Sequence, residues 1–109
     1  MKTRIKYIHP GEVLQEEFLI PMKISAYRLS KDIDIPRTRV SEIIKGRRRL
    51  TADTCLRLSK YFGNSAQFWM GLQSEYDIEE AQNRLKIPLE RIRRTNVKSV
   101  KIKSRTVKA

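Results

Sequence analysis

SAYRLSKDIDIPRTRVSEIIKG, residues 25–46, is the stretch of sequence that decides the fold. Ser25 is a suitable N-cap for a first helix, on which small and apolar residues recur with helical spacing. Asp34 falls where the chain must turn, and aspartate tolerates the left-handed backbone conformation better than most residues. Pro36 then suits the start of a second helix, because its nitrogen has no hydrogen to leave unpaired. The stretch therefore predicts two short helices joined by a tight turn, a helix-turn-helix.

The second helix of this motif has two unlike sides. Val40, Ile43 and Ile44 recur at helical spacing and predict a buried side. At about 100° per residue, the opposite side is polar. Arginine can pair with guanine, threonine can offer its methyl group to thymine, and glutamate can accept a hydrogen bond from cytosine. The residues predicted to contact base edges are Arg37, Thr38, Ser41 and Glu42, and those predicted to contact phosphates from the same helix are Arg39 and Lys45.

The charge of the chain is high and uneven. The formal net charge of the 109 residues is +12, which predicts a polyanionic partner. Residues 21–50 carry nine basic and three acidic residues, and residues 81–109 carry ten basic and one acidic. Gly46 suits the end of the second helix, and Arg47, Arg48 and Arg49 follow it. We predict that these three arginines contact phosphates, the alternative being a solvated basic loop.

Helices are predicted on both sides of the motif. His9-Pro10-Gly11-Glu12 resembles a helix start, and the helix is predicted to run from about residue 11 to residue 20, where Pro21 stops it. Thr51 and Ser65 are N-caps for two later helices, the first closed by Gly63. The inward-facing residues predicted for these two helices are Ala52, Cys55, Leu56, Leu58, Ser59 and Phe62 in the first, and Phe68, Trp69, Leu72 and Tyr76 in the second.

The chain is therefore predicted to form one all-α domain with two extensions. The predicted limits are an N-terminal arm at residues 1–9, the helix-turn-helix domain at 10–82 and an irregular basic C-terminal tail at 83–109. Val100 and Ile102 alternate with lysines as in an edge strand, whereas the overall composition suits a disordered polybasic arm. We favour the arm, which could become ordered against DNA or another subunit.

The residue types argue against an enzyme. His9, the sole histidine, stands at a helix start and is expected to be a cap or surface residue. Cys55 lies on an apolar helix face, where a structural role is commoner than a nucleophilic one. Metal-ligand spacings and glycine-rich phosphate loops are missing from the sequence, so we predict no catalytic residues, no metal and no cofactor. With one cysteine and no signal-like or membrane-spanning apolar run, we expect a cytoplasmic protein without a membrane partner.

Three segments in succession resemble the HigA family of addiction-module antitoxins, some of which are called virulence-associated protein I. These are HPGEVLQEEFL, YRLSKDIDIPRTRVSEIIKGRRRLTADTCLRLSKYFG and SAQFWMGLQSEYD, within residues 8–78. The resemblance implies a five-helix, lambda-repressor-like (Xre-type) domain that dimerises, represses its own operon and neutralises a HigB-type toxin that cuts mRNA. It places the recognition helix at residues 36–45 and further phosphate contacts at Ala26 and Tyr27. The chain departs from the family pattern at Asp34, where glycine is usual, and in its basic tail.

The resemblance implies double-stranded DNA, a HigB-type toxin and a second copy of the chain as partners. A twofold dimer would read an inverted repeat with half-sites about 10 base pairs apart. Two alternatives stay open: a solitary Xre-type regulator without a toxin, and a basic RNA-binding or ribosome-associated protein. Specific RNA binding usually needs exposed aromatic side chains for base stacking. Here the aromatic residues outside the predicted core faces are Tyr7, Tyr27 and Tyr61.

Overall fold

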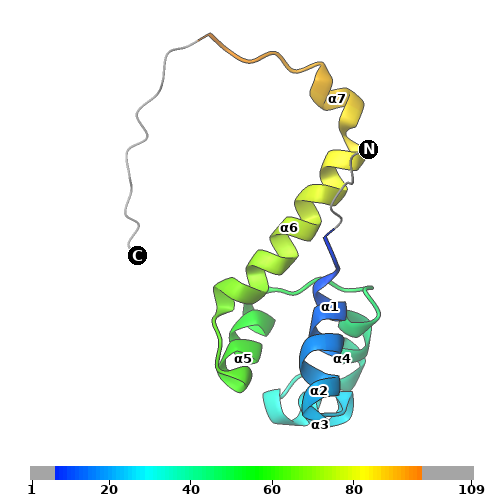
Figure 1. Ribbon diagram of the computed structural model, residues 1–109, viewed down its shortest axis with the longest axis vertical. Coiled ribbons are helices and arrows are strands. Elements are labelled where there is room, and N and C mark those ends of the chain that lie inside the picture. Colours follow the sequence, from blue (N-terminus) through cyan, green and yellow to red (C-terminus); the bar gives the residue numbers. More distant parts are fainter. Residues whose placement is uncertain (1–6, 97–109) are drawn as a thin grey trace.

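Figure 1 shows the computed structural model of the chain, which describes residues 7–96. Within this range every regular element is helical, as the sequence predicts. The elements are α1 (Pro10–Val13), the π-helix η1 (Leu14–Leu19), α2 (Ile20–Met22), α3 (Ala26–Ile33), α4 (Arg37–Ile44), α5 (Ala52–Phe62), α6 (Ala66–Arg84) and α7 (Lys86–Glu90). The short α7 forms inside the segment predicted as an irregular tail, and the possible strand at Val100 and Ile102 lies outside the described residues.

The first three elements form one continuous helix, so the prediction that Pro21 ends it is wrong (Figure 1). The backbone N–H of Ile20 donates to the carbonyl of Gln15, five residues earlier, which defines a π turn. A proline ring normally clashes with the carbonyl four residues before it. The wider π turn just ahead of Pro21 relieves this clash. The helix ends instead at Lys23, whose φ of 57° takes the chain out of the helical path.

The predicted N-caps and the predicted turn are confirmed. Ser25, Thr51 and Ser65 each accept a hydrogen bond through the side-chain oxygen from a backbone N–H three residues later, at 3.0, 3.3 and 3.0 Å. Asp34 has φ 58° and ψ 53°, the left-handed conformation expected at the turn. Each of these features depends on neighbours along the chain, which is why the sequence predicts them.

The core lies where α1, η1, α3, α4, α5 and the first half of α6 meet. Its largest fully buried apolar side chains are Trp69, Leu14, Leu29, Ile43, Leu50, Leu58 and Val40. The far half of α6 extends away from this body and leads to α7 (Figure 1). No helix within residues 7–96 is long and apolar enough to cross a membrane.

The inward face of α5 differs in part from the prediction. Cys55 and Leu58 are buried as expected, but Ala52 is exposed and Leu56 is 60% exposed. Thr54 is buried in their place, at 2% exposure. The reason is that α5 packs against α6 and α3 on the side that carries Thr54, Cys55 and Leu58, while its opposite side stays exposed among residues 7–96. Burial raises the pKa of the Cys55 thiol to about 11, as suits a structural cysteine rather than a nucleophile.

On α6 the prediction holds for Trp69, which is fully buried, whereas Phe68 is 41% exposed. The indole N–H of Trp69 donates to the side-chain oxygen of Asn64 at 2.9 Å. Tyr76 is half-buried and meets the His9 ring edge-on, with the ring centroids 5.0 Å apart. Gln73 also lies on the inner side of α6 and is 1% exposed. Because Gln73 is polar, the spacing of apolar residues did not predict its burial.

Candidate nucleic-acid interface

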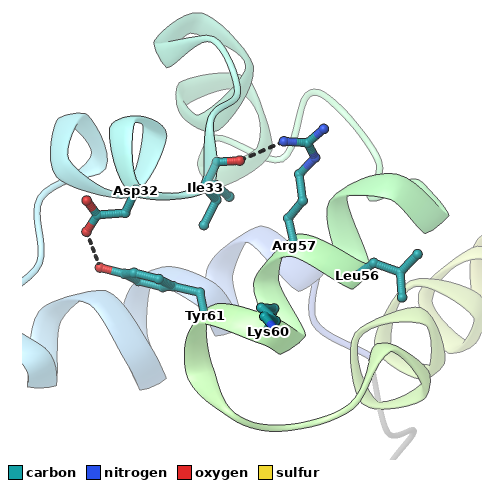
Figure 2. A pocket seen from close by; sticks show the side chains of 6 residues that line it. All are labelled: Asp32, Ile33, Leu56, Arg57, Lys60 and Tyr61. Atoms are coloured by element: carbon teal, nitrogen blue, oxygen red, sulfur yellow. Dashed lines mark hydrogen bonds between the residues drawn. The ribbon is translucent and has the colours of Figure 1, made fainter.

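The turn between α3 and α4 is fixed by its own backbone and by α5. The N–H of Ile35 donates to the carbonyl of Ser30 at 3.1 Å, and Ile35 is 8% exposed. The Arg57 guanidinium donates from one nitrogen to the carbonyls of Ile33 (2.8 Å) and Asp34 (3.1 Å). Sequence reasoning missed Arg57, because its partners lie more than twenty positions earlier and nothing local marks it. Arg57 therefore links α5 to the turn of the helix-turn-helix (Figure 2).

The start of α1 supports the C-terminal end of α4. Gly11 is buried, and a Cβ atom on it would lie 1.7 Å from the carbonyl oxygen of Ile43. His9 caps α1 by accepting the Gly11 N–H through Nδ1 at 2.9 Å, as the sequence predicts for a cap. Burial lowers the pKa of His9 despite the opposing negative charges of Asp77, Glu12 and Glu80. The neutral imidazole that accepts this hydrogen bond is therefore the favoured form.

The outer side of α4 carries most of the side chains that were predicted to reach DNA. Arg37, Thr38 and Lys45 are exposed, and Ser41 and Glu42 are half-buried. Arg39, which was predicted to contact a phosphate, is half-buried. Val40 and Ile43 on the inner side are each 1% exposed. The predicted buried side of α4 is thus confirmed for Val40 and Ile43, whereas Ile44 is half-buried.

Tyr27 lies beside this outer side and contacts two cations. The guanidinium carbon of Arg37 lies 5.3 Å from the centre of the Tyr27 ring, and the Lys31 ammonium lies 5.4 Å from it. Tyr27 is 52% exposed, while the neighbouring Ala26 is half-buried. Cations within about 6 Å of an aromatic face are attracted by the ring. The start of α3 therefore positions the first arginine of α4.

Two of the three arginines after α4 are already paired within the chain. The Arg48 Nε donates to Glu42 Oε1 at 2.8 Å, so the predicted base-reading carboxylate and a predicted phosphate-binding arginine share one ion pair. Arg49 pairs with Asp77 on α6. Arg47 is exposed and makes no ion pair within residues 7–96. The three arginines therefore differ in how readily they can meet an external anion.

The Arg49–Asp77 pair belongs to a network that attaches the loop to α6. Gln73 is 1% exposed; its amide nitrogen donates to Asp77 at 2.9 Å and its amide oxygen accepts the Leu50 N–H at 2.7 Å. Partial burial alone would raise the pKa of Asp77, but hydrogen bonds from Arg49 and Gln73 and the charge of Arg49 hold it below its usual value. Sequence reasoning missed Gln73 and Asp77, because their partners Leu50 and Arg49 lie more than twenty positions earlier in the chain.

Residues 7–96 contain no group of three or more His, Cys, Asp or Glu side chains placed to hold a metal ion. The polar side chains on the outer side of α4 are cationic and hydroxyl groups, together with the Glu42 carboxylate that is paired with Arg48. Such groups bind phosphate oxygens and base edges. The surface made by α4, the start of α3 and residues 46–49 is therefore the candidate nucleic-acid interface.

Comparisons with known proteins agree with this geometry. A helix-turn-helix family model, HTH_3, matches residues 16–69. Virulence-associated protein I of Dichelobacter nodosus is 46% identical over 81 residues, which cover 74% of this chain and 75% of that protein. The structure of Pseudomonas aeruginosa antitoxin HigA with the higBA promoter is 37% identical and superposes with a TM-score of 0.79 over 84% of this chain and all of that chain.

A second solved structure supports the same family. An addiction-module antidote protein of the HigA family from Coxiella burnetii is 42% identical, with a TM-score of 0.75 over 88% of this chain and all of that one. These matches extend well beyond the helix-turn-helix itself. The chain therefore belongs to the HigA family of helix-turn-helix antitoxins, which confirms the resemblance found in its sequence.

Proposed function

We propose that this protein binds the operator of its own operon as a repressor and acts as the antitoxin of a HigB/HigA-type toxin-antitoxin module. The observation that carries the proposal is the exposed polar side of α4 beside a basic loop, in a chain 37% identical to a HigA solved with its promoter. Exposed Arg37 and Thr38 project from a helix whose inner side is fully packed. A helix presented in this way can enter the major groove, where base edges are distinguishable.

The proposed roles of the side chains follow the earlier predictions, with one refinement. We assign Arg37, Thr38, Ser41 and Glu42 to base edges. The groups assigned to phosphates are Ala26, Tyr27, Arg39, Lys45, Arg47, Arg48 and Arg49. The refinement concerns Glu42, which meets DNA as an ion pair with Arg48 rather than as a free carboxylate. The proposed domain limits stay at residues 10–82, with residues 1–9 and 83–109 as extensions.

The proposed activity is binding, without catalysis. The antitoxin role requires a toxin partner. The proposed targets of the module are DNA and mRNA, so we propose that the protein acts in the cytoplasm. Copurification with the product of the adjacent gene tests the toxin partner directly. A solitary regulator would bring down no such product.

Footprinting on the DNA upstream of the gene tests the DNA-binding role. We expect protection of an inverted repeat whose half-sites lie about 10 base pairs apart, because a twofold dimer presents two copies of α4 one helical turn apart. A shuffled sequence of the same length is the control for non-specific binding. Protection of a single unrepeated or asymmetric site would contradict the proposal.

Replacing Arg37 with alanine is expected to weaken binding to the operator by about 1 to 3 kcal/mol, the usual cost of losing a bidentate contact to a base. Binding to unrelated DNA should change less, because Arg37 is assigned to a base edge. Titrations of both DNAs with the wild type and the variant measure the two changes. Equal losses on the two DNAs would move Arg37 to the phosphate-binding group.

Tyr27 offers a matched pair of substitutions. Tyr27→Phe keeps the ring beside Arg37 and removes the hydroxyl group, whereas Tyr27→Leu removes the ring. If the ring orients Arg37, Tyr27→Phe should preserve discrimination between operator and unrelated DNA, and Tyr27→Leu should reduce it by about 2- to 5-fold, the worth of an exposed cation–π contact. If the hydroxyl group instead binds a phosphate, both variants should lose affinity equally on all DNAs.

A further inference from the structure

His9 lies where three elements meet. Its Nδ1 accepts the Gly11 N–H at 2.9 Å and so caps α1, which lies beside both α4 and α6 (Figure 1). Its ring meets the Tyr76 ring of α6 edge-on, with the centroids 5.0 Å apart. On a third side lies Gly46, just after α4, where a Cβ atom would be 3.7 Å from Cγ of the His9 ring. One imidazole ring therefore adjoins α1, α6 and the C-terminal end of α4.

The start of α1 and the end of α4 are in backbone contact. Gly11 lies so close to Ile43 that a Cβ atom at Gly11 would be 1.7 Å from the Ile43 carbonyl oxygen. The same carbonyl accepts the Gly46 N–H at 3.0 Å. The residue whose N–H is capped by His9 therefore packs against the peptide group that closes α4. A change in this cap reaches α4 through backbone atoms rather than through flexible side chains.

Only the neutral form of the imidazole can make this cap. A neutral imidazole has one nitrogen that carries a hydrogen and one that accepts. After protonation both nitrogens are donors, so Nδ1 would face the Gly11 N–H as donor against donor, and no rotation of the ring restores an acceptor. Gly11 is buried, and a buried N–H without a partner is costly. Protonation of His9 therefore removes the cap and leaves the start of α1 without a replacement.

The surroundings of the ring favour the neutral form. The charges that act on His9 in the opposite direction are those of Glu12 on α1 and of Asp77 and Glu80 on α6. Asp77 is already paired with Arg49, and Gly46 brings no charge from the loop after α4. His9 itself makes no ion pair within residues 7–96. Burial therefore outweighs the carboxylates and lowers the pKa of His9 from its usual value of 6.5.

We infer that His9 is a positioning residue for operator recognition: its neutral ring holds the end of α4 against α1 and α6, and protonation of the ring weakens operator binding. The inference rests on the proposed function, since α4 is the helix assigned to base edges. Its direction is opposite to that of a simple charge effect, because an added positive charge strengthens binding to DNA. A fall in pH to about 5.5, within the range in which histidine titrates, therefore releases the operator.

The pH profile of operator affinity tests the inference on the full chain. His9 is the sole histidine, so few other groups change charge between about pH 5.5 and pH 7.5. If only the neutral form holds α4 in place, affinity should fall as the pH drops below the pKa of His9, with a limit of about tenfold per pH unit. His9→Asn is the informative variant, because asparagine caps a helix through its side-chain oxygen and does not titrate. It should bind within about 3-fold of the wild type at pH 7.5 and keep that affinity at pH 5.5.

Two further variants separate positioning from general stability. His9→Ala removes the cap at every pH and should bind the operator at least about 5-fold more weakly at pH 7.5, with a flat pH profile. Ser65→Ala is the matched control, because it removes the corresponding cap at the start of α6, where Ser65 accepts the Phe68 N–H at 3.0 Å. This control should lower the melting temperature but keep the wild-type operator affinity and pH profile.

Two measurements without DNA test the same residue. Because the pKa of His9 is lower in the folded than in the unfolded chain, His9 stabilises the fold above about pH 6.5, and this contribution is lost as the pH falls below that value. The melting temperature should therefore fall further on acidification in the wild type than in His9→Asn. In NMR titrations the Ile43 amide resonance should shift with the same midpoint as the His9 ring, and it should not shift in His9→Asn.

Three results would overturn the inference. They are equal pH profiles of operator affinity in the wild type and His9→Asn, full operator affinity of His9→Ala at pH 7.5, and an Ile43 amide that does not follow the His9 ring. Failure of the wild type to bind any operator at pH 7.5 would instead refute the proposed function. The NMR titration would then decide by itself whether His9 positions α4.

Discussion

Replacing Gly11 with alanine is expected to destabilise the protein by about 3 kcal/mol or more, which corresponds to a fall in melting temperature of roughly 10 to 20 °C. A Cβ atom at this position would lie 1.7 Å from the Ile43 carbonyl oxygen. The obstacle is backbone, not the end of a flexible side chain, so α1 and α4 must move apart. Because Ile43 is on the helix proposed to read DNA, operator affinity should fall as well. Thermal unfolding followed by circular dichroism measures the first effect.

Gly71 provides the matched control for this substitution. It lies within α6, and a Cβ atom there would meet nothing within 4 Å. Gly71→Ala should therefore stabilise the protein by about 0.5 to 1 kcal/mol, since alanine loses less backbone entropy in a helix. Opposite shifts in the two melting temperatures are expected. Similar shifts would mean that the close approach of Gly11 to α4 does not limit stability.

Replacing Arg47 and Arg48 together with glutamine is expected to weaken binding to every DNA sequence by about 50-fold per bound subunit at 0.1 M salt. Each lost phosphate contact removes about 0.9 from the slope of log affinity against log salt, so the slope should fall by about 1.8 per subunit. Loss of Arg48 also leaves the Glu42 carboxylate unpaired next to the phosphates. Arg49 is left in place, because its pairing with Asp77 gives it a structural role that would confuse the result.

The control removes the same charge elsewhere. Arg84→Gln with Lys86→Gln changes two exposed cations at the far end of α6 and the start of α7. This variant should keep the wild-type salt slope. Titrations at several salt concentrations, on operator and on unrelated DNA, give both slopes. An unchanged slope in the Arg47 and Arg48 variant would exclude this loop from the interface.

The HPGE segment shows how sequence and structure complement each other. It helps to carry the family resemblance, yet its sequence alone explains only a helix start. The structure adds the reason: His9 caps the helix, Pro10 begins it, and Gly11 leaves room for the Ile43 carbonyl. The last of these depends on where α4 lies, more than thirty residues later. A local pattern can therefore be recognised before its packing role is understood.

By itself the sequence determined the helices α3 to α6, the N-caps Ser25, Thr51 and Ser65, and the turn at Asp34, as well as the polar side of α4 and the burial of Val40 and Ile43. These features arise from hydrogen bonds, dihedral preferences and apolar spacing within a few residues, and so they can be read along the chain. Only the tertiary structure decided which α5 residues are buried and that Pro21 lies inside a helix. It also decided the partners of three arginines: Arg48 pairs with Glu42, Arg49 pairs with Asp77, and Arg57 binds the α3–α4 turn. The physical reason is that burial and ion pairing depend on which elements meet in space. Apolar spacing marks the sides of a helix that can pack, and the arrangement of the other helices selects which of them does.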